Sequence, residues 1–167
     1  MDNKSNIVLI GMPASGKSTI GVILAKMLGK DFLDTDLVIQ QREQALLCEI
    51  IEQRGVSGFL KCEEAAVLSV SPSDTVIATG GSVVYSDEAV RHLSGTATVI
   101  YLKVEKEEIV RRLHNIKERG VVLKDGESFD DMFIERSILY EKYADVIIEE
   151  DSDLEGTIEK IIIQMRV

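Results

Sequence analysis

One stretch decides the fold of this chain: Gly11-Met12-Pro13-Ala14-Ser15-Gly16-Lys17-Ser18-Thr19, which fits the pattern G-x-x-x-x-G-K-[ST] of phosphate-binding loops. The apolar run Ile7-Val8-Leu9-Ile10 precedes it and predicts a buried strand. Residues 17–28 follow with a helical pattern that ends at Gly29, a residue typical of helix C-termini. We therefore expect a strand, a glycine loop and a helix in succession, the context that this pattern requires.

The residue types of the loop suit a polyphosphate. Gly11 and Gly16 allow the backbone to turn tightly and to aim N–H groups at an anion, beside the positive N-terminal end of the helix. Lys17 is expected to reach the β- and γ-phosphates, and the Ser18 hydroxyl to bind Mg²⁺. The alternative, a turn without a ligand, fits such a complete match poorly. The predicted nucleotide-binding residues of the loop are Gly11, Ala14, Ser15, Gly16, Lys17, Ser18 and Thr19.

Bulk properties favour a single domain over residues 1–167. The chain has 167 residues, of which 45% are apolar, enough for a substantial core. No apolar run approaches the ~20 residues of a membrane span, and the first residues lack the apolar region of a signal peptide. We therefore expect a cytoplasmic protein without a membrane partner. The net charge of −10 argues against nucleic acid as a partner, and we expect a monomer.

Apolar runs alternate with helical patterns along the chain, which predicts an α/β fold with a five-stranded parallel sheet between two helical layers. The predicted strands are Asn6–Ile10, Asp31–Leu33, Thr75–Ala78, Thr98–Leu102 and Asp145–Ile148. The predicted helices are Lys17–Leu28, Leu37–Gln53, Gly58–Val70, Asp87–His92, Lys106–Asn115, Phe129–Tyr143 and Asp153–Arg166.

Polar residues follow two further strands, at the carboxyl edge where parallel sheets bind ligands. In Asp34-Thr35-Asp36, one acid suits Mg²⁺ and the other suits an acceptor hydroxyl or its proton. Alternatively, one of the two acids caps the next helix. Gly80 and Gly81 permit close approach of a ligand to the backbone, although a plain turn explains them equally well.

Two arginines in the second half suit a phosphoryl-transfer site. Arg119 lies in a charged segment, about 114–128, which we expect to form a flap over the phosphates rather than a simple surface connection. Such a flap would bring a cation to the charge that leaves the γ-phosphate. Arg136 is expected to bind an anionic group of the acceptor, the alternative being a structural ion pair with an acid.

In these motifs the sequence resembles the shikimate kinase family, P-loop small-molecule kinases of the nucleoside monophosphate kinase type. The resemblance covers nearly the whole chain. It depends on the order and spacing of several segments, which makes it more specific than the loop alone. These segments are Gly11–Thr19, Leu33–Asp36, Gly58-Phe59 with Glu63, Ala78–Gly81, Arg111-Arg112, Arg136–Tyr140 and Ala144-Asp145.

The resemblance implies a five-stranded parallel sheet, a flap and an acceptor-binding helical region at about residues 37–70. It implies a kinase that transfers the γ-phosphoryl group of ATP to shikimate, with Mg²⁺ as cofactor. In this family pattern Lys17, Asp36 and Arg119 are catalytic, and Ser18 with Asp34 serves the metal. Arg112 packs against adenine, and the acceptor is bound by Asp36, Gly80, Gly81 and Arg136.

Three positions depart from the family pattern. Leu60 stands where the family has an arginine that pairs with the shikimate carboxylate, and the adjacent Lys61 points about 100° away on a helix. Ser82 replaces the third glycine of a triple glycine, and Gly120 replaces the proline after the flap arginine. The departures leave open a different hydroxylated acceptor. A further alternative is a nucleotide-binding regulatory protein without catalysis.

Overall fold

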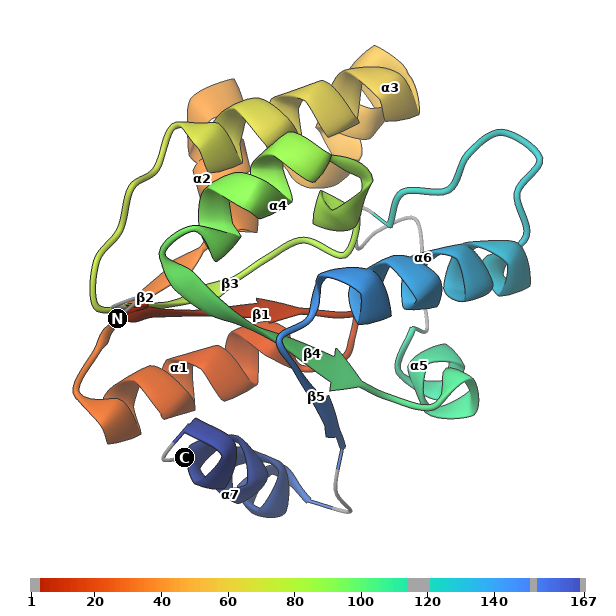
Figure 1. The fold of residues 1–167 in the computed structure, drawn as a ribbon. Coiled ribbons are helices and arrows are strands. Elements are labelled where there is room, and N and C mark those ends of the chain that lie inside the picture. The colour runs from red at the N-terminus through yellow and green to blue at the C-terminus, as the bar shows by residue number, and fades with distance from the viewer. Residues whose placement is uncertain (1–3, 114–120, 151–152, 166–167) are drawn as a thin grey trace.

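A five-stranded parallel sheet organises the molecule, as the sequence predicts. The computed structural model describes residues 4–113, 121–150 and 153–165. The strands lie in the order β2-β3-β1-β4-β5, with helices on both faces (Figure 1). The strands are β1 (Asn6–Ile10), β2 (Asp31–Asp34), β3 (Thr75–Ala78), β4 (Ala97–Lys103) and β5 (Val146–Glu149).

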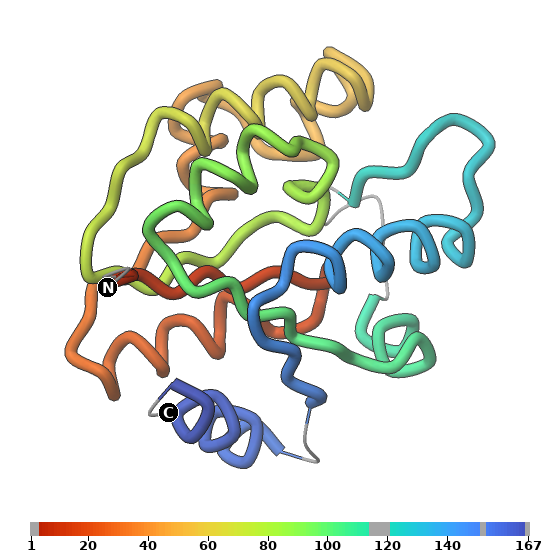
Figure 2. Tube along the Cα trace, in the orientation of Figure 1, coloured from red at the N-terminus to blue at the C-terminus, as the bar shows by residue number. Residues whose placement is uncertain are grey.

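The helices connect successive strands in the manner expected of right-handed parallel crossovers. The order along the chain is traced in Figure 2. The α-helices are α1 (Lys17–Leu28), α2 (Thr35–Glu43), α3 (Leu47–Leu68), α4 (Asp87–Ser94), α5 (Lys106–Arg112), α6 (Phe129–Tyr143) and α7 (Leu154–Met165), and a short 3₁₀ helix, η1, spans Val83–Tyr85.

Alternate residues of β1 supply the two faces of the core. Ile7 and Leu9 pack with α1 and α7, whereas Val8 and Ile10 pack with α4 and α6 on the other face. All four side chains are buried, as expected for the central strand of a sheet that is covered on both sides. A third cluster joins α2 to α3 around Ile39, Phe59 and Val122. These layers are visible in Figure 1, with α1 and α7 below the sheet.

The predicted helix Leu37–Gln53 is wrong in its continuity. The structure ends α2 at Glu43 and begins α3 at Leu47, because Gln44 adopts a left-handed conformation with φ 52°. The predicted break between Gln53 and Gly58 corresponds to a kink within α3, with helical turns on both sides of Gly55. That residue alone breaks the helical geometry of α3, with φ 68° and ψ 178°. Helix propensity is only a weak preference, and the packing of α2 and α3 against each other overrides it between these two helices.

The remaining elements match the predictions to within a few residues at each end. Strand β5 begins at Val146 rather than at Asp145, because the Asp145 carboxylate accepts a hydrogen bond from the backbone N–H of Val99. The described part of α5 ends at Arg112, so the predicted end at Asn115 lies outside the described residues. Gly29 ends α1 with φ 68°, which confirms the predicted glycine cap.

Candidate active site

The glycine loop lies between β1 and α1, with glycines where the backbone needs them. Gly11 and Gly16 have φ values of 149° and 86°, a region that favours glycine. A Cβ at Gly11 would lie 2.7 Å from the carbonyl oxygen of Leu102 on β4, so a side chain there would collide with the sheet. Backbone shape and packing both select glycine at this position.

Lys17 lies at the start of α1 and is 7% exposed. Its ammonium group donates hydrogen bonds to the carbonyl oxygens of Gly11 (2.8 Å) and Met12 (2.7 Å), which fold the side chain across the loop. Burial lowers the pKa of Lys17 to about 8, although the carboxylates of Asp36 and Asp34 oppose this effect. The amine is thus a desolvated cation at the mouth of the loop, a favourable partner for phosphate oxygens.

Ser18 and Asp34 are brought together although 16 residues separate them. The Ser18 hydroxyl donates a 2.6 Å hydrogen bond to one carboxylate oxygen of Asp34, at the end of β2. The other oxygen accepts from the backbone N–H of Asp36 and caps α2. Asp34 is therefore the acid of the pair that caps the next helix. A metal role for Ser18 and Asp34 stays a prediction.

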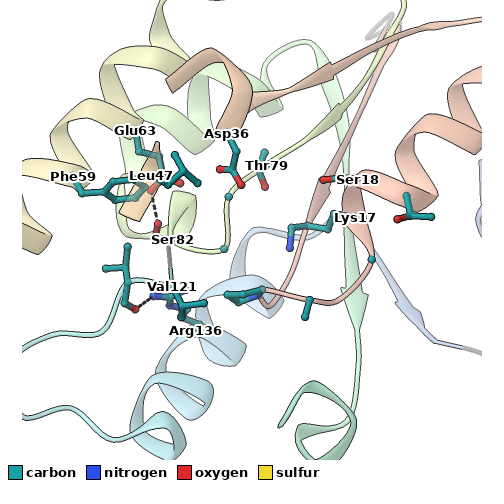
Figure 3. A pocket seen from close by; sticks show the side chains of 17 residues that line it. Lys17, Ser18, Asp36, Leu47, Phe59, Glu63, Thr79, Ser82, Val121 and Arg136 are labelled. Carbon is teal, nitrogen blue, oxygen red and sulfur yellow. Dashed lines mark hydrogen bonds between the residues drawn. The ribbon is translucent and has the colours of Figure 1, made fainter. Parts of the chain in front are cut away.

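Asp36 faces a cavity of about 390 Å³ that also contains Lys17, Gly80, Gly81 and Arg136 in its wall. Figure 3 shows Asp36 and Lys17 directed into the same hollow. Burial raises the pKa of Asp36 to about 6, and the nearby Asp34 carboxylate adds to this effect. A carboxyl group with a pKa near neutrality is suited to accept a proton from a hydroxyl.

A side chain at Gly80 would have to displace two carboxylates that lie above it. A Cβ at this position would lie 2.4 Å from Glu63 Oε1 and 2.8 Å from Asp36 Oδ1. A Cβ at Gly81 would lie 2.8 Å from Pro13 Cδ and 3.2 Å from Arg136 Nη1. Both glycines line the cavity, and the close approach of a ligand to their backbone stays a prediction.

Arg136 is 1% exposed although it carries a full charge. Its guanidinium group donates hydrogen bonds to the Tyr85 hydroxyl (3.3 Å) and to the carbonyl oxygen of Val122, and it lies 5.2 Å from the Tyr85 ring centroid. No carboxylate forms an ion pair with it within the parts of the chain that the structure describes. A buried guanidinium held by neutral groups at a cavity wall is suited to a ligand anion.

Comparison with known proteins shows to which family the chain belongs. The sequence model of the shikimate kinase family matches residues 13–166. The chain belongs to the shikimate kinase family. It is 35% identical to the shikimate kinase of Aliivibrio fischeri over 99% of this chain and 98% of that relative. It is 37% identical to the shikimate kinase of Histophilus somni over 90% of this chain and 89% of that relative.

Solved shikimate kinases share the fold. The enzyme from Acinetobacter baumannii, solved in complex with shikimate, superposes with a TM-score of 0.88 at 28% identity and covers 98% of this chain and 94% of that one. The enzyme from Aquifex aeolicus gives a TM-score of 0.82 at 29% identity, with 96% of each chain covered. The chain is thus an ATP-dependent kinase of this family. The described helices include none that is long and apolar enough to cross a bilayer.

The resemblance predicts two arginines, Arg112 and Arg119, on the nucleotide side of the site, and the structure describes only Arg112. Arg112 lies beside the loop, where it donates to the carbonyl oxygen of Ala14 (3.3 Å) and to both oxygens of Glu150 (2.7 and 2.8 Å). Its packing against adenine stays a prediction. Arg119 lies outside the described residues, as does the first part of the predicted flap; of that segment, Val121 and Val122 line the cavity.

Glu63, to which the sequence motifs assign no role, is 2% exposed and lies at the cavity wall. Its Oε2 accepts a 2.6 Å hydrogen bond from Ser82, while Oε1 is buried without a hydrogen-bond partner among the described residues. Burial raises the pKa of Glu63 to about 7. The sequence contained one signal for this burial, since Glu63 lies on the same helix face as the apolar residues Phe59, Cys62 and Ala66.

Leu60, at the position of the family arginine, does not line the 390 Å³ cavity. It lines a second cavity of about 610 Å³ between α3 and the segment that precedes α6. Glu63 and Ser82 belong to the walls of both cavities and so separate them. The exposed Lys61 also lines the second cavity, so it does not bring a cation into the cavity that contains Asp36.

Proposed function

We propose that this chain transfers the γ-phosphoryl group of ATP to a hydroxyl of shikimate, forming shikimate 3-phosphate and ADP. The observation that carries the proposal is a single hollow with the loop cation Lys17 on one side and Asp36 on the other. Gly81 and Arg136 extend this hollow to a buried cation suited to a carboxylate. Phosphoryl donor and anionic acceptor can therefore be bound side by side, as in-line transfer requires.

On the donor side, the loop from Gly11 to Thr19 is proposed to bind the polyphosphate, and Arg112 to contact adenine. Lys17 would exchange its hydrogen bonds to the Gly11 and Met12 carbonyl groups for bonds to phosphate oxygens. Because folding has already removed water from the amine, phosphate binding would require little further desolvation of this group.

The oxygens of Ser18 and Asp34 fit Mg²⁺. Mg²⁺ prefers hard oxygen ligands and is usually held by one or two protein groups together with phosphates and water. The paired hydroxyl and carboxylate supply two such oxygens at the loop, and the described residues contain no cluster of three or more metal-binding side chains that would form a closed cage. When bound, Mg²⁺ would neutralise charge on the phosphates.

On the acceptor side, Asp36 is proposed to orient the shikimate hydroxyl and take its proton. Gly80 and Gly81 allow the acceptor to lie against the strand end, and Arg136 would bind its carboxylate. Arg119 is proposed to approach the phosphates from the flap. The monomeric state and the cytoplasmic location stay predictions from the sequence.

Release of ADP, measured in a coupled assay with MgATP and shikimate, tests the proposal. Asp36→Asn should lower kcat by about a hundredfold or more, because the general base is lost. Asp31→Asn, at the opposite and exposed end of β2, is the matched control and should retain parental activity. ADP release that does not depend on shikimate would contradict the proposal.

Leu60 gives one specific reason to test a different acceptor. A panel of hydroxylated acids in the same assay would reveal one if its kcat/KM exceeds that of shikimate. ATP binding without turnover on any acid would instead support a regulatory nucleotide-binding protein.

A further inference from the structure

Two of the three departures from the family pattern, Leu60 and Ser82, meet at one carboxylate. Leu60 and Glu63 are three residues apart on α3, so their side chains are neighbours on the helix surface. An arginine at position 60 would therefore have Glu63 within reach. This chain has leucine there, and no ion pair of Glu63 is found among the described residues.

Ser82 approaches the same carboxylate from the opposite side. The residue is 4% exposed, and its hydroxyl donates to Glu63 Oε2 at 2.6 Å, drawn as a dashed line in Figure 3. Glycine, the family residue at this position, has no group that could make this bond. Relative to the family pattern, Ser82 therefore adds a hydrogen-bond donor beside the Glu63 carboxylate, whereas Leu60 removes a cation from its surroundings.

The bond to Ser82 fixes where the second oxygen points. With Oε2 held, Oε1 lies above Gly80, next to Asp36 Oδ1. This oxygen is buried and has no hydrogen-bond partner among the described residues. A buried polar atom of this kind is costly unless a ligand satisfies it. The acceptor hydroxyls that Asp36 binds under the proposed function would occupy this same space.

We propose that Ser82 is a positioning residue of the acceptor site, which holds the Glu63 carboxylate toward the acceptor in place of an arginine at position 60. This inference rests on the proposed function and adds a specificity element to it. Ser82 does not touch the reacting atoms; it acts through Glu63. The residues at positions 60 and 82 are therefore coupled through Glu63. The Ser82 hydroxyl should affect shikimate binding most when position 60 is not arginine, and an arginine at position 60 should affect it most when the Ser82 hydroxyl is absent.

The charged groups around Glu63 come from several elements and act in both directions. Asp36 on α2 raises the pKa of Glu63, whereas the Ser82 hydrogen bond, Arg136 on α6 and Lys17 on α1 lower it. The charged side chains that line the second cavity together with Glu63 are those of Arg54, Lys61, Glu64, Lys124 and Asp125. Removal of the Ser82 hydroxyl should therefore raise the pKa of Glu63, and a cation at position 60 should lower it.

A double-mutant cycle tests the coupling through Ser82→Ala, Leu60→Arg and the double variant. Ser82→Ala should raise KM for shikimate about tenfold and leave KM for ATP unchanged, because only the acceptor contact loosens. Leu60→Arg should lower KM for shikimate by a larger factor in the Ser82→Ala background than in the parent. Equal factors in both backgrounds, or an unchanged KM in Ser82→Ala, would overturn the inference.

Two further variants separate positioning from stability. Ser82→Thr keeps the hydroxyl and should retain a KM close to that of the parent. Ser86→Ala is the matched control: it removes a neighbouring serine hydroxyl that binds Glu64 and caps α4, so it should lower the unfolding temperature without changing KM for shikimate. If Ser82→Ala does not fold, Ser82→Gly, the family's own residue at this position, replaces it.

A readout without substrate distinguishes failure of this inference from failure of the proposed function. The ¹³C chemical shift of the Glu63 carboxyl, followed against pH, should report a higher pKa in Ser82→Ala and a lower one after Leu60→Arg is added. An unchanged pKa in both variants would overturn the positioning role. Absence of shikimate-dependent ADP release in the parent chain would contradict the proposed function alone.

Discussion

Lys17 is a buried cation at the loop, and phosphate is the ligand that we propose for it. Its hydrogen bonds to Gly11 and Met12 hold the ammonium group at the loop, and burial lowers its pKa to about 8. Such a group contributes more to a transition state than an exposed lysine because little reorganisation is needed when charge develops. We therefore expect the residue to affect the rate of transfer more than the stability of the fold.

Lys17→Ala should lower kcat for phosphoryl transfer by about a thousandfold or more, since the lost donor acts on the developing phosphate charge. Lys26→Ala, on the exposed side of the same helix, is the matched control and should keep parental kinetics. Steady-state ADP release and thermal unfolding measure the two properties separately. Parental turnover in a folded Lys17→Ala variant would refute the role assigned to the loop.

At this same scale, some site residues were predictable and others were not. The loop pattern identifies Lys17 and Ser18, and the strand-end rule identifies Asp34, because sequence spacing and sheet topology fix their positions. Glu63 and Ser82 were not assigned, since their pairing across 19 residues depends on how α3 packs against the loop after β3. No local pattern encodes that contact.

Elements with strong patterns were predicted well, and those fixed by packing were not. Helix α6 has the predicted bounds, and in the structure Ser128 and Asp131 form a capping box at its start. The break between α2 and α3 was missed, because Gln44 carries no turn signal although it adopts φ 52°. The described residues 121–128 form a loop that leads into α6 (Figure 2), and Lys124 forms an ion pair with Glu135 of that helix.

The helix ends allow a test of backbone strain. Gly29 has φ 68°, and a Cβ there would meet no atom within 4 Å, so Gly29→Ala should destabilise the protein by about 1 kcal/mol through conformation alone. Gln44→Gly should have the opposite effect, a gain of a few tenths to about 1 kcal/mol, because glycine adopts this left-handed conformation more readily. Urea unfolding with comparison of midpoints measures both, and equal signs for the two variants would contradict a conformational cause.

Across the whole molecule, the hollow concentrates buried charge that the ligand-free fold does not fully compensate. Lys17 and Arg136 face the carboxyl groups of Asp36 and Glu63, and burial raises the pKa of both acids. These buried charges should lower the free energy of unfolding of the ligand-free protein, and they suit the hollow to charged ligands. The cost should be visible as a pH dependence of the ligand-free protein.

For Glu63, the direction of this dependence follows from the raised pKa. The native carboxyl group has a pKa of about 7, above its ordinary value of 4.5, so the native state binds more protons than the unfolded state between these values. The free energy of unfolding must then fall as pH rises through this range. At about 1.4 kcal/mol for each pH unit, the contribution of Glu63 reaches roughly 3 kcal/mol. Asp36, with a pKa of about 6, acts in the same direction.

Glu63→Gln should remove this contribution, because an amide of the same shape cannot ionise and can still accept the Ser82 hydrogen bond. We expect the ligand-free variant to be more stable than the parent by about 1–3 kcal/mol at pH 8 and close to it at pH 5. Urea unfolding at a series of pH values measures the difference, with Glu52→Gln on the exposed face of α3 as the control that should follow the parent curve. A variant that is less stable than the parent at pH 8 would show that Glu63 is held as a favourable anion, which would contradict the picture of uncompensated charge in the hollow.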